Sequence, residues 1–331
     1  MKLKVVEQSR LWWSVSLALT VAGAIAVIGC MVNFGTPLKL GLDFLGGTKL
    51  QLQLACETPQ SQPQCQRPIE LADVRGVLTT QGLEGAAVQL LDVDSKAQDR
   101  HIIAIRSQDL AADKRAALVS ALEAKLGKFD PQGTQIDTVG PILGQQVLSS
   151  GVMAVLLSLL GIVIYLSFRF QWDYAAFAVV ALVHDVLITT GAFAALGWFG
   201  GTEIDTLFIV ALLTIIGFSV NDTVVIYDRV RENIDQHPTL PIGQVVNDAV
   251  NQTLTRSINT TASTLLSVVA IFLFGGSTLH DFSLALIIGF VSGAYSSIFI
   301  ASTLLAWWRS RPGYVPPKPR PQSETKLQDS I

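Results

Sequence analysis

Several ionisable side chains lie inside long apolar stretches of the sequence, where they could carry a proton or another ion. Asn221 and Asp222 interrupt an apolar run that begins near Ile204, and His184 and Asp185 lie near the middle of another. Ionisable residues within a membrane span are costly; they face the bundle interior or water and mark proton and ion pathways. Proton or ion transfer is therefore the first chemistry that these residues suggest.

A polar stripe marks a further apolar segment. Its members recur at offsets of three and four residues, so they share one face of a helix for four turns. The members are Gln252, Arg256, Asn259, Thr260, Ser263 and Ser267. Such a stripe is expected to face the bundle interior or water, where Arg256 can meet a carboxylate. The alternative is that Arg256 lies near the membrane interface and snorkels to it.

Asp222 near Arg256 would form a proton site whose occupancy can change. Loss of water disfavours the charged form of a carboxyl group, whereas a neighbouring guanidinium favours it. A small displacement of the Arg256 stripe would therefore switch the protonation of Asp222. One elementary charge that crosses the membrane field gains about 2.3 kcal/mol per 100 mV, and that energy could move a domain outside the membrane.

His184 and Asp185 also have a structural interpretation. The face of Asp185 carries small residues, which suit close helix packing: Ala178, Ala181, Thr189 and Ala192. A hydrogen bond between helices explains His184 at least as well as proton transfer, and a metal site lacks a third ligand at usable spacing. On the last span, Gly289, Gly293 and Ser297 recur every four residues and predict another close-packing face.

The composition indicates an integral membrane protein. Half of the 331 residues are hydrophobic and only 15% are charged, and a span needs roughly 20 apolar residues. Six stretches are long enough: 11–32, 148–168, 174–196, 204–227, 257–276 and 283–306. The sequence predicts an all-α bundle of six membrane helices, with the last five spans in residues 148–306.

Basic residues set the expected orientation. They gather at the N-terminus, at Arg169, after residue 227 and in the tail, whereas the loops 197–203 and 275–282 contain no Lys or Arg. By the positive-inside rule both termini are cytoplasmic. The segments assigned to the cytoplasm are 1–10, the loop 228–256 and the Pro-rich tail 307–331. Residues 33–147 then form an extracytoplasmic domain.

The first apolar stretch has the length of a span. Leu11 to Met31 contains no charge, whereas the apolar region of a signal peptide has about 7 to 15 residues. We therefore expect a membrane helix here rather than lipoprotein processing at Cys30. Cys56 and Cys65 lie on the oxidising side in this topology, and both a disulfide and two free thiols stay open.

The extracytoplasmic segment alternates between strand and helix periodicity. Strand-like and helix-like patterns follow one another at 49–54, 69–81, 87–93, 101–106, 113–126 and 134–139. Their order, β-α-β-β-α-β, is typical of a ferredoxin-like α+β domain. The preceding run Gly41 to Gly47 (GLDFLGG) contains no phosphate-binding motif, so we expect a tight turn where the chain leaves the membrane.

Six motifs together resemble the SecD/SecF family of protein-export membrane proteins, on the SecF side. In chain order they are GLDFLGG (41–47), VGPILGQQV (139–147), VHDVLITTG (183–191), NDTVVIYDRVREN (221–233), QTLTRSINTTAST (252–264) and FLFGG (272–276). The similarity covers about residues 10 to 306. The Cys56 to Cys65 insertion and the Pro-rich tail depart from the family pattern.

The resemblance implies a subunit that pairs with SecD beside the SecYEG translocon, with YajC as a further expected partner. Such a pair uses the proton motive force to complete preprotein export across a bacterial inner membrane, in a bundle similar to resistance-nodulation-division exporters. Asp222 and Arg256 match the family's transport pair, and Asp185 matches its His-Asp motif. The supporting polar residues are Asn221, His184, Asn259 and Thr260. The partner carboxylate lies on SecD, and no cofactor beyond the coupling ion, proton or sodium, is implied.

Three other function classes remain as alternatives. A small-molecule exporter of the resistance-nodulation-division type would need two outer loops and twelve spans, so this chain would be half of one. An intramembrane aspartyl protease would need a second Asp in a G-x-G-D context, which the sequence lacks, so we do not expect an enzyme. A passive scaffold would make the proton gradient irrelevant.

Overall fold

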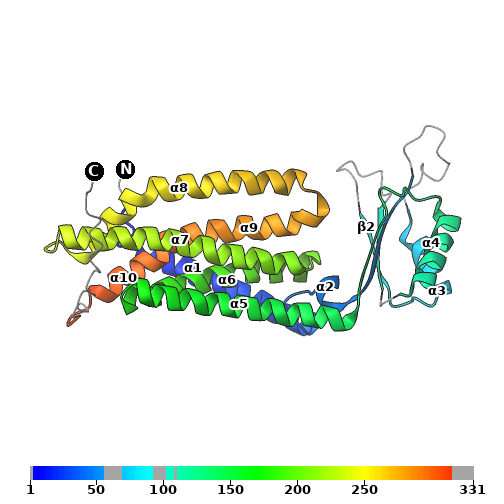
Figure 1. Cartoon of the computed structure of the whole chain (residues 1–331), viewed down its shortest axis with the longest axis horizontal. Coiled ribbons are helices and arrows are strands. Elements are labelled where there is room, and N and C mark those ends of the chain that lie inside the picture. Colours follow the sequence, from blue (N-terminus) through cyan, green and yellow to red (C-terminus); the bar gives the residue numbers. More distant parts are fainter. Residues whose placement is uncertain (1–2, 56–68, 92–101, 108–109, 315–331) are drawn as a thin grey trace, which may run out of the picture. The chain divides into compact units, whose positions relative to one another are not determined.

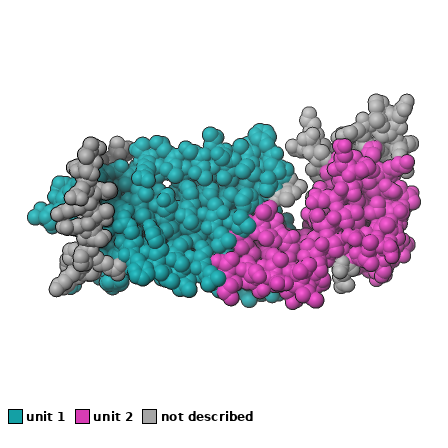
Figure 2. Space-filling view, viewed as in Figure 1, with its two compact units in different colours: residues 1–38, 155–202, 210–331 teal, residues 39–154, 203–209 magenta. Residues whose placement is uncertain are grey.

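The structure is a computed structural model that describes residues 3–55, 69–91, 102–107 and 110–314. It divides into two compact units (Figure 2): a helical unit of residues 1–38, 155–202 and 210–331, and a sheet unit of residues 39–154 and 203–209. Cys56 and Cys65, for which a disulfide was one prediction, lie outside the described residues.

Among the residues that the structure describes, six helices are long and apolar enough to cross a membrane, as the sequence predicts. The first four are α1 (Ser9–Phe34), α5 (Pro141–Arg169), α6 (Trp172–Ala195) and α7 (Thr206–Gln236). They are followed by α8 (Ile242–Phe274) and α9 (Gly276–Ser296). Two π-helical turns extend this set: η2 (Leu196–Gly200) continues α6, and η3 (Ser297–Ala301) joins α9 to α10 (Ser302–Arg309).

The expected loop 228–256 is almost entirely helical. Helix α7 continues to Gln236 and α8 begins at Ile242, so only residues 237–241 connect them. The helix ends beyond the apolar stretch are polar on several faces, and hydropathy alone therefore did not extend the helices into them.

Helices α6 and α9 lie against one another in the helical unit, and α8 runs beside α9 (Figure 1). The predicted close-packing face of the last span finds its neighbour within this chain, on α7. A Cβ atom at Gly289 would lie 2.2 Å from Ile215 Cδ1, and one at Gly293 would lie 3.2 Å from Ser219 Cβ. Glycine at these positions thus lets α9 approach α7 closely.

A buried ion pair joins the start of α6 to the end of α10. Arg309 donates to both oxygens of Asp173, at 2.8 and 3.1 Å, and the exposed fractions of the two side chains are only 8% and 0%. Arg309 also donates to Gln171 at 2.8 Å, and the Tyr314 hydroxyl donates to Asp173 at 2.8 Å. These bonds satisfy a carboxylate that would otherwise be costly to bury.

The sheet unit contains the β-α-β-β-α-β order that the sequence predicts. Its elements are β1 (Gly47–Gln53), α3 (Leu71–Thr80), β2 (Ala87–Leu91), β3 (Ile102–Ser107), α4 (Ala112–Leu126) and β4 (Gln135–Val139). The strands form one antiparallel sheet in the order β2-β3-β1-β4. A one-turn helix, α2 (Leu42–Leu45), precedes β1.

Helices α3 and α4 cover one face of this sheet (Figure 1). Leu50 on β1 pairs with Ile105 on β3, and both side chains are fully buried against the helices. Because side chains alternate across a strand, Lys49 and Gln51 of β1 lie on the opposite face of the sheet. This alternation is the pattern from which the strands were predicted.

Candidate functional site

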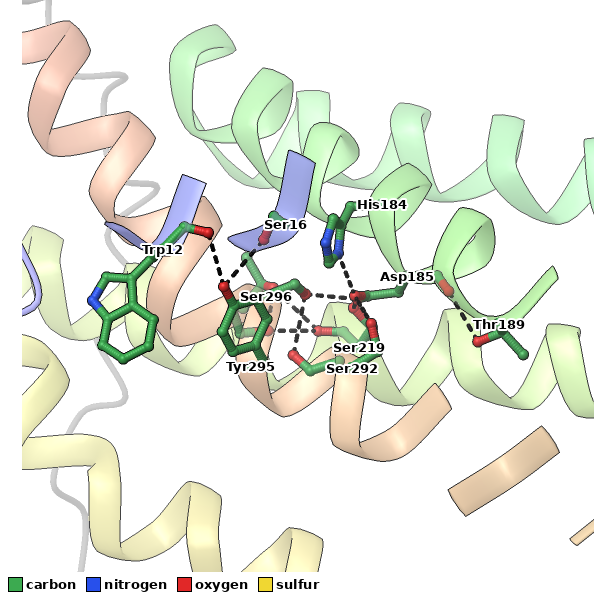
Figure 3. A network of polar contacts seen from close by, with 12 residues as sticks. Trp12, Ser16, His184, Asp185, Thr189, Ser219, Ser292, Tyr295 and Ser296 are labelled. Atoms are coloured by element: carbon green, nitrogen blue, oxygen red, sulfur yellow. Dashed lines mark hydrogen bonds and ion pairs between the residues drawn. The ribbon is translucent and has the colours of Figure 1, made fainter. Parts of the chain in front are cut away.

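The carboxylate of Asp185 is fully buried and its oxygens are surrounded by hydrogen-bond donors (Figure 3). Ser219 and Ser296 each donate to Oδ2 at 2.6 Å, and Ser292 donates to Oδ1 at 2.7 Å. Nδ1 of His184 lies 3.1 Å from Oδ1 and is a fourth donor in the tautomer that carries its hydrogen there. An ionised carboxylate offers about four acceptor sites, so this set fills them.

The four donors come from three helices, so one carboxylate joins α6, α7 and α9. Small residues on α6 permit the close approach, since Ala178 and Ala181 are also buried. Thr189, which was placed on the same face, donates instead to the backbone oxygen of Asp185 at 2.9 Å. The serine donors make Asp185 a link between three helices, whereas the hydrogen bond of His184 lies within α6. A role of Asp185 or His184 in carrying protons stays a prediction.

A second hydrogen-bonded chain lies beside His184 (Figure 3). Ser16 of α1 donates to the Tyr295 hydroxyl at 3.1 Å, and Tyr295 donates to the Trp12 backbone oxygen at 3.0 Å. Nε2 of His184 is buried and has no hydrogen-bond partner within the described chain. The same part of the chain contains no cluster of three or more His, Cys, Asp or Glu side chains that could hold a metal ion.

Asp222 has a different environment from Asp185. Its exposed fraction is 6%, and Ser257 on α8 donates to its Oδ1 at 2.8 Å. Its Oδ2 is buried with no partner among the residues that the structure places. The neighbouring Thr223 turns the other way and forms a 2.7 Å hydrogen bond with Ser297. Asp222 therefore keeps a free acceptor atom inside the helical unit.

Arg256, Asn259 and Thr260 lie on the exposed face of α8. The buried face of that helix carries Ser257 and Thr261 instead. Arg256 forms no ion pair within the described residues, so its expected meeting with a carboxylate stays a prediction.

The remaining polar residues of α7 have separate roles. Asn221 is exposed, so the Asn-Asp pair points in two directions. The buried Tyr227 hydroxyl donates to the Ala301 backbone oxygen at 3.0 Å. Asp228 forms an ion pair with Arg169 at 2.9 Å. These contacts occupy the Tyr-Asp sequence that suggested an aspartyl protease.

Four serines donate to the two carboxylates, namely Ser219, Ser257, Ser292 and Ser296, and none was recognised as a site residue from the sequence. Ser292 and Ser296 are four residues apart on α9, on the face that carries Gly289 and Gly293. Serine is small enough for a close helix contact, so the sequence does not distinguish these donors from packing residues. Ser257 was overlooked because its neighbour Arg256 belongs to the more polar stripe.

The chain matches known proteins over most of its length. The family model for the C-terminal part of the SecD/SecF protein export membrane proteins matches residues 119–311, and the SecD/SecF GG motif matches residues 34–57. The protein translocase subunit SecF of Synechocystis sp. is 53% identical, with 93% of this chain and 95% of that protein covered. The protein translocase subunit SecDF of Brucella abortus is 35% identical, with 90% of this chain and 36% of that protein covered.

The fold agrees with a solved relative. The crystal structure of SecDF from Thermus thermophilus, a translocon-associated membrane protein, has a TM-score of 0.76 at 30% sequence identity. The match covers 94% of this chain and 39% of that one, so this chain corresponds to about two fifths of the SecDF polypeptide. The chain therefore belongs to the SecF family of protein translocase subunits, multi-pass membrane proteins of the Sec pathway.

Proposed function

We propose that this chain pairs with SecD and uses the proton motive force to complete preprotein export, with Asp222 as the group that takes up and releases the proton. The observation that carries the proposal is the buried Oδ2 of Asp222, which has no partner in the described chain. A proton can bind there without displacing any donor, because Ser257 bonds only the other oxygen. Intramembrane carboxyl groups of this kind mark proton pathways.

Protonation would change the contact between two helices. The ionised Asp222 accepts a hydrogen bond from Ser257, which links α7 to α8. The protonated form carries an O–H donor on Oδ2. That donor requires a hydrogen-bond acceptor, which the ionised form does not require. Such a change biases α7 and α8 between two arrangements, which is the step that a proton-driven subunit requires.

SecD is proposed to cover the exposed stripe of α8. Gln252, Arg256, Asn259 and Thr260 are all exposed in this chain, and a stripe of that polarity is costly against lipid. A SecD carboxylate facing Arg256 would supply the ion pair that this chain does not provide. The SecDF polypeptide of Brucella abortus supports the pairing, since this chain matches only 36% of it.

The sheet unit is proposed to be a ferredoxin-like domain outside the cytoplasm that contacts the preprotein. Both termini would then lie in the cytoplasm of a bacterial-type inner membrane, and the SecYEG translocon and YajC would be further partners. The Sec relatives give no support to the alternative of a small-molecule exporter, and a transport role requires no catalytic group. Proton is the proposed coupling ion, with sodium as the competing choice.

The proposal is tested in inverted membrane vesicles that contain the SecD pair and the translocon. Asp222→Asn and Arg256→Met are each expected to abolish the stimulation of preprotein export by a proton gradient, while export driven without the gradient persists. Asp228→Asn is the matched control, because that carboxylate is half-exposed and paired with Arg169. Unchanged gradient-dependent export in both variants would refute the proposal. If a sodium gradient alone stimulates export, the coupling ion is sodium rather than the proton.

A further inference from the structure

The Gly41 to Gly47 segment ends in a backbone conformation that strongly favours glycine. Gly46 and Gly47 have φ angles of +72° and +123°, values that other residues rarely take. A Cβ atom at Gly46 would lie 2.7 Å from Pro141 Cα, and one at Gly47 would lie 2.5 Å from the Ser107 oxygen. The paired glycines thus bring the chain against the first residue of α5 and the end of β3.

The helical part of the same segment, α2, also contacts the first turn of α5. A Cβ atom at Gly144 would lie 2.7 Å from the backbone oxygen of Phe44, and the Phe44 side chain is buried. Helix α5 follows β4 after the single residue Gly140. The sheet is therefore attached to α5 by the chain itself and by this glycine contact.

The segment is attached to α7 by hydrogen bonds. Oδ2 of Asp43 accepts a 2.9 Å hydrogen bond from the backbone N–H of Thr206, the first residue of α7. Gly41 N donates to the Ile204 oxygen at 2.8 Å, and Ile204 N donates to the Lys39 oxygen at 2.9 Å. A carboxylate at a helix N-terminus is stabilised by the free N–H groups and the helix dipole.

Two ion pairs of Glu203 connect the sheet to the residues before α7. Glu203 forms an ion pair with Arg106, which lies on β3, and another with Lys39 at 3.5 Å. All of these residues belong to the sheet unit, which includes residues 203–209. The first residues of α7 are therefore part of the same compact body as the sheet.

We propose that the Gly41 to Gly47 segment is the mechanical junction through which α7 moves the sheet, with Asp43 as the positioning residue. This inference rests on the proposed function, in which protonation of Asp222 shifts α7. Helix α7 is continuous from Thr206 to Asp222, about 24 Å along its axis. A helix transmits an axial or rotational shift over that length, and Asp43 holds the end at which the shift arrives.

The experiment measures hydrogen–deuterium exchange in the full chain, purified with its SecD partner in lipid nanodiscs. Asp222→Asn mimics the protonated carboxyl, and its effect is read in peptides that cover 39–47, 102–107 and 224–236. We expect it to change exchange in all three. When Asp43→Ala is present, Asp222→Asn should no longer change the exchange of peptides 39–47 and 102–107. It should still change the exchange of peptide 224–236.

A second variant deletes the same hydrogen bond from its donor side. Thr206→Pro removes the N–H group, and proline is tolerated at the first position of a helix. Thr206→Ala is the matched control, since it keeps the N–H and should behave as the native chain. Asp43→Asn keeps one oxygen acceptor and should restore part of the response.

The outcomes separate the junction from the proposed function. If the sheet peptides still respond to Asp222→Asn in both Asp43→Ala and Thr206→Pro, the junction proposal is overturned. If Asp222→Asn leaves 224–236 unchanged and export keeps its dependence on the gradient, the proposed function itself fails. Loss of the response in Asp43→Ala and Thr206→Pro, but not in Thr206→Ala, supports the junction.

Discussion

Ser257 on α8 donates a 2.8 Å hydrogen bond to one oxygen of Asp222 on α7, and the other oxygen of that carboxyl group is buried without a partner in the described chain. The carboxylate of Asp185 presents the opposite case, because donors occupy both of its oxygens. A proton on Oδ2 of Asp222 would break no hydrogen bond of the described chain, whereas a proton on Asp185 would displace a donor. The two buried carboxylates are thus suited to different tasks.

Ser257→Ala is expected to weaken proton-gradient-dependent export severalfold without abolishing it. The substitution removes the hydrogen-bond donor of Asp222. Protonation of Asp222 then no longer changes a hydrogen bond between α7 and α8. Export of a preprotein into vesicles, with and without an uncoupler, measures the effect. Ser149→Ala is the control, since that exposed serine on α5 bonds only the Gln146 backbone oxygen. Gradient-dependent export at the native level in Ser257→Ala would contradict the prediction.

Ser219→Ala, Ser292→Ala and Ser296→Ala are expected to lower the stability of the helical unit rather than the proton coupling. Each removes one donor from Asp185, and a hydrogen bond within a membrane bundle contributes about 1 kcal/mol. Thermal unfolding in detergent should show losses that are similar for the three serines. The remaining export should keep its dependence on the gradient. If any of these variants unfolds normally yet loses that dependence, Asp185 carries protons after all.

The membrane helices and the strands could be predicted from the sequence because each has a strong physical signal. The thickness of the hydrocarbon core requires long apolar runs, and a half-buried sheet requires alternation such as that of Leu50 and Leu52. The polar end of α7 near Gln236 gives no such signal. The helix continues beyond the apolar stretch to Gln236, in a segment that was predicted to be a loop.

The contacts of the candidate site could not be predicted, because they depend on how each helix is rotated about its own axis. The amino-acid composition does not determine that rotation. Arg256 and Ser257 are adjacent in sequence, so the stripes that contain them lie about 100° apart around α8. The stripe of Arg256 contains more polar residues and is the stronger signal in the sequence, whereas Ser257 faces Asp222 in the structure. Only the register of α7 against α8 distinguishes the two.

Gly191→Ala is expected to destabilise the chain strongly. A Cβ atom at Gly191 on α6 would lie 2.6 Å from Cα of Gly23 on α1, so the two helices would have to separate. Overpacking of this kind costs about 1 to 3 kcal/mol. The control is Gly161→Ala on α5, where no heavy atom lies within 4 Å of the added Cβ. Unfolding temperatures measured in one detergent compare the two, and equal temperatures would contradict the close crossing of α1 and α6.

Arg309→Met should be far more damaging than Arg169→Met, although both remove an arginine from an ion pair. Breaking a buried pair costs about 3 to 5 kcal/mol, whereas an exposed pair contributes about 0 to 1 kcal/mol. Asp173 and Arg309 are almost fully buried, while the side chains of Arg169 and Asp228 are 40% and 36% exposed. Denaturant or thermal unfolding of the two variants measures the difference.

A double variant distinguishes the lost pair from lost packing of the arginine side chain. In Arg309→Met the buried carboxylate of Asp173 keeps Tyr314 as a donor, and burial raises the pKa of the Tyr314 phenol, so its hydroxyl stays protonated. One neutral donor cannot replace a guanidinium, so Asp173→Asn in the Arg309→Met background should recover much of the lost stability by removing the unpaired charge. If the double variant is no more stable than Arg309→Met, the loss arises from packing against Tyr174, over whose ring the Arg309 guanidinium lies at 4.3 Å.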